Sequence, residues 1–171
     1  MRTLKTFIIL FTAFITYLTA KAQDKTANTA VNNVLSAYLD VKNALTADNN
    51  AQTKAKAKDL LAAIAAVPMD KLTADQHKLW MTYAEKLEFD SRHISQSDAI
   101  DHQREHFTSL SKNMYEVTKG LKLNTNTVYE QYCPMKKATW LSETNAIKNP
   151  YYGKQMLTCG KTTETLAPAA K

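Results

Sequence analysis

The stretch Ile100–Leu121, IDHQREHFTSLSKNMYEVTKGL, carries the strongest fold signal in the sequence. Its core-forming positions recur at steps of three and four residues, at Ile100, Gln103, Phe107, Leu110, Met114, Val117 and Leu121. This spacing places them on one face of an α-helix, and such a face is buried against other elements. Ser97 is suited to cap the start of this helix, and Gly120 is suited to end it in the left-handed conformation.

Three earlier segments show the same helical periodicity. Their apolar positions are Val31, Val34, Leu35, Tyr38, Val41 and Leu45 in the first, Ala57, Leu60, Leu61, Ile64 and Val67 in the second, and Leu79, Trp80, Tyr83 and Leu87 in the third. Thr73 and Gln76 have the spacing of a capping box at the start of the third segment. Four amphipathic helices with short connections predict a mainly α protein, an antiparallel four-helix bundle over about residues 30–120.

The composition changes after Gly120. Residues 128–133 alternate in polarity, which is typical of a short strand, and residues 162–166 are suited to a second strand. We expect residues 126–166 to dock on the bundle as an aromatic, turn-rich segment, with a small β-hairpin as one option, because so short a segment cannot fold alone. Residues 23–171 are therefore expected to form a single domain.

The first 22 residues have the three parts of a secretory signal peptide. Arg2 and Lys5 precede an uncharged, apolar run over residues 6–19, and residues 20–22 (AKA) fit the small-x-small cleavage rule. The run has the length of a signal-peptide core and is short for a membrane span. We therefore expect cleavage before Gln23, a periplasmic or secreted protein, and no stable membrane insertion afterwards.

The charge of the chain does not point to a nucleic-acid partner. There are 22 Lys and Arg against 16 Asp and Glu, and three of the basic residues lie in the predicted signal peptide, which leaves a net charge of +3 on residues 23–171. These charges are interspersed rather than clustered. The sequence also lacks a nucleotide-binding glycine loop, a G-x-S-x-G elbow and an H-E-x-x-H helix, so we expect no enzyme and assign no catalytic residue.

The two cysteines each have a methionine nearby, in Cys133-Pro134-Met135 and in Met156-Leu-Thr-Cys159. Two thiolates and two thioethers brought together would form a soft site, suited to Cu(I) or Ag(I). The alternative is a Cys133–Cys159 disulfide, since an even number of cysteines in an exported protein usually forms one. Such a bridge would close a loop of about 27 residues and stabilise the fold by about 3–4 kcal/mol in the chain-entropy model.

The histidines form a second group of candidate ligands. His102 and His106 are four residues apart, so their rings can meet on one face of the predicted fourth helix, and His93 lies near the end of the third. His106 is placed at the edge of the apolar stripe and His102 toward solvent. His106 is therefore a candidate further donor to a Cu or Zn site. Arg104 is expected to hold the C-terminal segment through backbone carbonyls or an acid.

Several strings resemble a known family. They are YEQYCPM at 129–135, NPYYG at 149–153, MLTCG at 156–160 and QREHF at 103–107. Together they resemble an exported bacterial family classed as a domain of unknown function, whose members occur alone or fused to periplasmic adaptor subunits of copper/silver efflux pumps. The resemblance implies heavy-metal handling, with periplasmic metal-efflux components as partners.

Two functions follow from these observations. The first is a periplasmic copper or silver buffer or carrier linked to metal efflux or homeostasis, with Cys133, Met135, Met156 and Cys159 as ligands and His106 as a further donor. The second is a non-enzymatic protein-interaction module, in which a structural Cys133–Cys159 disulfide staples a cap that presents Trp140, Tyr151 and Tyr152 to a partner.

Overall fold

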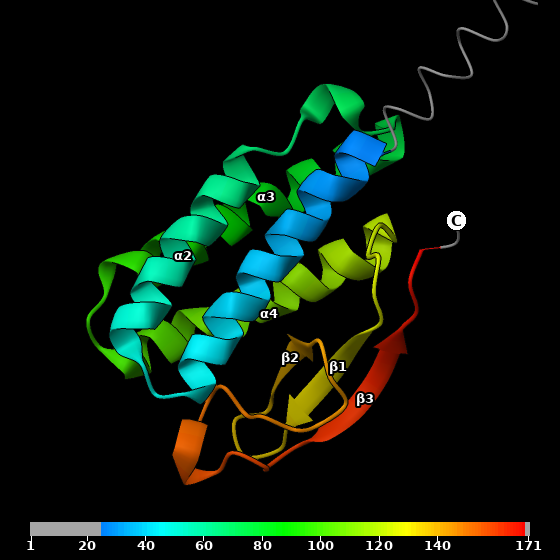
Figure 1. Ribbon diagram of the computed structural model, residues 1–171. Coiled ribbons are helices and arrows are strands. Elements are labelled where there is room, and N and C mark those ends of the chain that lie inside the picture. Colours follow the sequence, from blue (N-terminus) through cyan, green and yellow to red (C-terminus); the bar gives the residue numbers. More distant parts are fainter. Residues whose placement is uncertain (1–24, 170–171) are drawn as a thin grey trace, which may run out of the picture.

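A computed structural model describes residues 25–169, and the predicted signal peptide lies outside them. Four helices pack side by side, and a small sheet packs alongside the fourth helix (Figure 1). The first helix covers residues 25–46, and α2 (Asn50–Ala65), α3 (Ala74–Gln96) and α4 (Ile100–Leu121) follow, with a 3-10 turn η1 (Met69–Lys71) before α3. The prediction of a mainly α protein with four sequentially packed helices is confirmed.

The helix ends follow from local side-chain chemistry. Asn49 caps α2 by accepting the backbone N–H of Gln52, and the predicted capping box of Thr73 and Gln76 is present at the start of α3. Two end predictions are wrong. Ser97 lies in the connection between α3 and α4 and accepts the N–H of Ala99, which itself precedes α4. The left-handed residue at the end of α4 is Lys122, with φ 51°, because the helix continues through Gly120.

The C-terminal segment forms a three-stranded antiparallel sheet in the order β2-β1-β3. The strands are β1 (Val128–Cys133), β2 (Ala138–Ser142) and β3 (Lys161–Leu166), and a 3-10 turn η2 (Gly153–Gln155) lies between the last two. The sequence predicted β1 and β3. It missed β2 because most of that strand is buried, so its polarity does not alternate.

The sheet docks on the bundle through buried aromatic side chains. Tyr38 stacks on Phe107 at a centroid distance of 5.3 Å, and Tyr151 contacts both Phe107 and Trp140. The Tyr38 hydroxyl accepts the backbone N–H of Leu141 in β2 at 3.1 Å. Trp140 and Tyr151 are therefore core residues. The hypothesis that they are presented to a partner is wrong, because docking the sheet covers both rings.

Arg104 on α4 holds the segment between β2 and β3, as the sequence predicted. Its Nε donates to the carbonyl of Pro150 at 2.9 Å, and its Nη2 pairs with Asp48 at 2.5 Å. Gly153 lies against this pair with φ 53°, and a Cβ there would meet the Asp48 carboxylate. This contact ties the turn after the first helix to residues 149–153.

Within residues 25–169, no helix combines the length and the apolar character that crossing a bilayer requires.

Candidate metal centre

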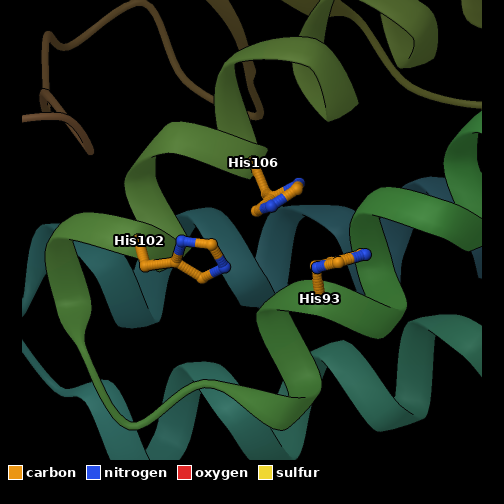
Figure 2. A group of neighbouring side chains, drawn as sticks. All are labelled: His93, His102 and His106. Carbon is orange, nitrogen blue, oxygen red and sulfur yellow. The ribbon is translucent and has the colours of Figure 1, made fainter.

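Three histidine side chains converge where α3 ends and α4 begins (Figure 2). His93 comes from α3, and His102 and His106 come from α4. One nitrogen of each ring lies within 4.8 Å of the corresponding nitrogens of the other two. Among residues 25–169, this is the one group of three or more His, Cys, Asp or Glu side chains whose ligand atoms lie close enough together to hold a metal ion.

The helical hairpin explains why these rings meet. His102 and His106 are one turn apart on α4, so they share a face. Three residues connect α3 to α4, and the helices then run antiparallel, which places the last turn of α3 beside the first turns of α4. The buried Gln103 braces the connection, because its side-chain amide donates to the carbonyls of Ser97 at 2.8 Å and Asn50 at 3.1 Å.

The rings are close enough to act as one ligand set. His93 and His106 stack with centroids 4.4 Å apart and an interplanar angle of 17°. His102 meets His106 edge-on at 4.7 Å. Neutral imidazole nitrogens are ligands for zinc and copper, and three of them leave further coordination positions for water or another ligand.

A buried carboxylate orients the central ring. Asp90, only 3% exposed, accepts the Nδ1 hydrogen of His106 at 3.0 Å. This bond leaves the lone pair of His106 on Nε2, which is the nitrogen available to a metal ion. Metal-binding histidines in proteins commonly make such a bond to a carboxylate, which fixes the ring orientation and makes the nitrogen a stronger donor.

The cluster is open on one side. The His106 side chain is 17% exposed and that of His102 is 45% exposed. Phe89, which is exposed, contacts the rings of both His93 and His106. The cluster is therefore in contact with solvent at His102, while Asp90 beside His106 is buried.

The predicted cysteine pair is brought together elsewhere in the fold. Cys133 is buried at the end of β1, Cys159 is half-buried before β3, and both are free thiols. Burial raises the pKa of the Cys159 thiol, and the neighbouring Cys133 adds to the rise. Cys133 is thus one of the groups that act on the Cys159 thiol, and the predicted Cα separation of the two cysteines stays a prediction.

The remaining predicted ligands, Met135, Met156 and His106, lie in three different environments. Met135 is 63% exposed in the turn between β1 and β2, and Met156 is half-buried before Cys159. The described ring and ion-pair contacts of His106 are with Asp90, Phe89 and the other two histidines. The structure thus places His106 in a histidine cluster, whereas the sequence had grouped it with sulfur ligands.

Sequence reasoning did not assign His93 to the site. The signal was nevertheless available. A residue three positions from the end of one helix and residues in the first two turns of the next must lie close together when the connection is only three residues long. Combining that rule with the His102 and His106 pair would have found the third histidine of the cluster.

The fold and the cluster define a small helical domain with a candidate three-histidine metal centre. The chain belongs to the family described as "Protein of unknown function (DUF3347)", whose model matches residues 34–126, more than half of the chain. The matched region contains all three histidines and ends before β1. Comparisons with curated proteins and with solved structures found no match.

Proposed function

We propose that this protein is an exported metal-binding protein, a buffer or carrier for copper, and that His93, His102 and His106 hold the ion. The observation that carries the proposal is the convergence of three imidazole nitrogens within 4.8 Å of one another. The Asp90 carboxylate supports it, because that side chain orients His106 as a ligand and is itself buried.

The ligand chemistry favours copper over other divalent ions. Nitrogen ligands bind first-row divalent metals with affinities that rise to Cu(II) and fall again at Zn(II). Three imidazoles without a thiolate do not have the set of four ligands that is usual for structural zinc. The open side at His102 suits an ion that must be both bound and released.

The cellular role rests on sequence. The signal-peptide pattern of residues 1–22 supports export, and the resemblance to domains fused to copper/silver efflux adaptors supports a role in metal efflux or homeostasis. We propose periplasmic efflux components as the partners that load or unload the site. Binding and transfer of an ion require no catalytic residue.

A Cu(II) titration tests the proposal. It uses purified protein in which both cysteines are replaced by alanine, so that sulfur neither binds nor reduces the ion. Binding is followed by isothermal calorimetry and by electron paramagnetic resonance. We expect one Cu(II) per chain with nitrogen ligands. The His93→Ala, His102→Ala double variant keeps the His106–Asp90 pair and should lose affinity by about 100-fold or more, since it lacks two of three ligands.

The matched control is His77→Ala, which removes the fourth histidine of the chain at an exposed position on α3. That variant should bind Cu(II) as the parent does. Equal binding by the double variant and the control would refute the histidine centre, and a stronger response to Zn(II) than to Cu(II) would refute the assignment of copper.

A further inference from the structure

We propose a second metal site at the end of the sheet, where Cys133 and Cys159 bind one soft monovalent ion, Cu(I) or Ag(I), with methionine thioethers as additional ligands. This site shares no residue with the histidine centre. Either proposal can therefore fail while the other stands.

Two hydrogen-bonded turns bring the four sulfur-containing side chains into one region. Cys133 ends β1 and Met135 lies in the turn that follows, which is closed by the Lys137 N–H donating to the Cys133 carbonyl at 2.8 Å. Met156 and Cys159 lie in the turn before β3, closed by the Cys159 N–H donating to the Met156 carbonyl at 3.0 Å. Because Tyr132 pairs with Lys161, the end of β1 lies beside the residues that precede β3.

The pairing of β1 with β3 brings the two cysteines close together, since Cys133 follows Tyr132 and Cys159 lies two residues before Lys161. The Cys133 sulfur accepts the backbone N–H of Lys136 at 3.4 Å. The thiolate is the form of cysteine that binds a metal, and it can accept the same N–H.

The exposure of Met135 shows that its side chain is not part of the core. A methionine near cysteines is usually a gap-filling core side chain. Met135 is 63% exposed, so it fills no gap. Its three rotatable bonds let the thioether turn toward Cys133, two residues away, and a thioether favours a soft ion over a hard one.

The binding step is an exchange of protons for the ion. Two thiols and one monovalent cation give a bis-thiolate complex with a net charge of −1, and two protons go to solvent. The competing reaction is oxidation. There the two thiols lose two protons and two electrons to a small-molecule disulfide such as oxidised glutathione, which is reduced to two thiols, and Cys133 and Cys159 form a disulfide that cannot bind the ion.

An anaerobic Cu(I) competition tests the site. The protein carries His93→Ala and His102→Ala, which disable the histidine centre, and is reduced without denaturant before titration against a chromophoric Cu(I) chelator. We expect one Cu(I) per chain and protection of both thiols from a maleimide. Cys133→Ala with Cys159→Ala should lower Cu(I) affinity by about 100-fold or more, because both thiolates are lost.

Met135→Leu tests the thioether, and Met81→Leu is its matched control. Met81 is 49% exposed on α3, so both variants make the same change on an exposed side chain. Met135→Leu should weaken Cu(I) binding several-fold and Met81→Leu should not change it. Equal effects of these two substitutions would remove Met135 from the ligand set.

Two results would overturn the proposal as a whole. The first is equal Cu(I) retention by the parent and the double cysteine variant. The second is a Cys133–Cys159 disulfide that reductant opens only when the protein is unfolded, since the pair would then be a structural bridge in the native protein.

Discussion

Replacing Asp90 by asparagine tests how the histidine centre is built. Asp90→Asn keeps the size of a side chain that is only 3% exposed, but removes the charge that faces the His106 Nδ1 hydrogen 3.0 Å away. The new amide can also present its NH₂ group to Nδ1, which favours the wrong tautomer of the ring. Copper affinity should fall in this variant. A bound cation makes the His106 ring more positive, so the buried Asp90 carboxylate stabilises the metal-bound ring more than the free ring.

The size of the effect follows from the hydrogen bond. A bond to a charged group stabilises by about 1.5–3 kcal/mol and a neutral one by about 0.5–1.5 kcal/mol, so losing the charge costs about 1–1.5 kcal/mol. Tautomer competition adds to this. Loss of such a partner typically lowers metal affinity 10- to 100-fold, which corresponds to about 1.4–2.7 kcal/mol. We therefore expect Cu(II) to bind Asp90→Asn 10- to 100-fold more weakly.

The assay is calorimetric Cu(II) titration of the cysteine-free protein. Electron paramagnetic resonance of the loaded site should also change, which a purely structural role of Asp90 would not require. Asp101→Asn is the control, since Asp101 precedes His102, is 97% exposed and undergoes the same change in charge. Less than about a threefold change is expected there, because solvent screens an exposed charge. Equal affinities and spectra for the two variants would show that Asp90 does not position the ligand.

Four further measurements test the fold and its export. In Asp48→Asn, we expect a loss of about 1 kcal/mol in the free energy of unfolding at neutral pH, because Asp48 accepts a backbone N–H and pairs with Arg104. Those contacts hold the pKa of Asp48 below its ordinary value, so the difference from the parent should shrink as pH falls below about 4, and a constant difference in chemical denaturation would contradict this. Gly153→Ala should destabilise by about 2–4 kcal/mol, since a positive φ and a clash with Asp48 add, and an unchanged melting temperature would refute the close approach. Tyr38→Phe should lower the free energy of unfolding by about 1–3 kcal/mol, because it leaves the buried N–H of Leu141 without its acceptor. A smaller loss in urea denaturation would mean that another group accepts this N–H. Mass spectrometry of exported protein should show a chain beginning at Gln23, and a product that retains residues 1–22 would exclude cleavage there.

The comparison of sequence and structure shows where local patterns are sufficient. The stripe of α4, the capping box at Thr73 and the strand β1 were all predicted, because each depends on side chains only two to four residues apart. The role of Arg104 was also predicted, since an arginine at the edge of a buried stripe needs acceptors close to the core. Prediction became less accurate for β2, where burial on both sides removes the alternation on which strand recognition depends.

The sequence by itself determined the fold class, the helix positions and the types of metal-binding side chain available, because periodicity and residue chemistry are properties of the chain. Only the tertiary structure decided which of those side chains meet. It brought His93 to His102 and His106, supplied Asp90 as the buried partner of His106, and separated this set from the cysteines. The physical reason is that a metal site is a set of distances between residues on different elements, and those distances are set by how helices and strands pack.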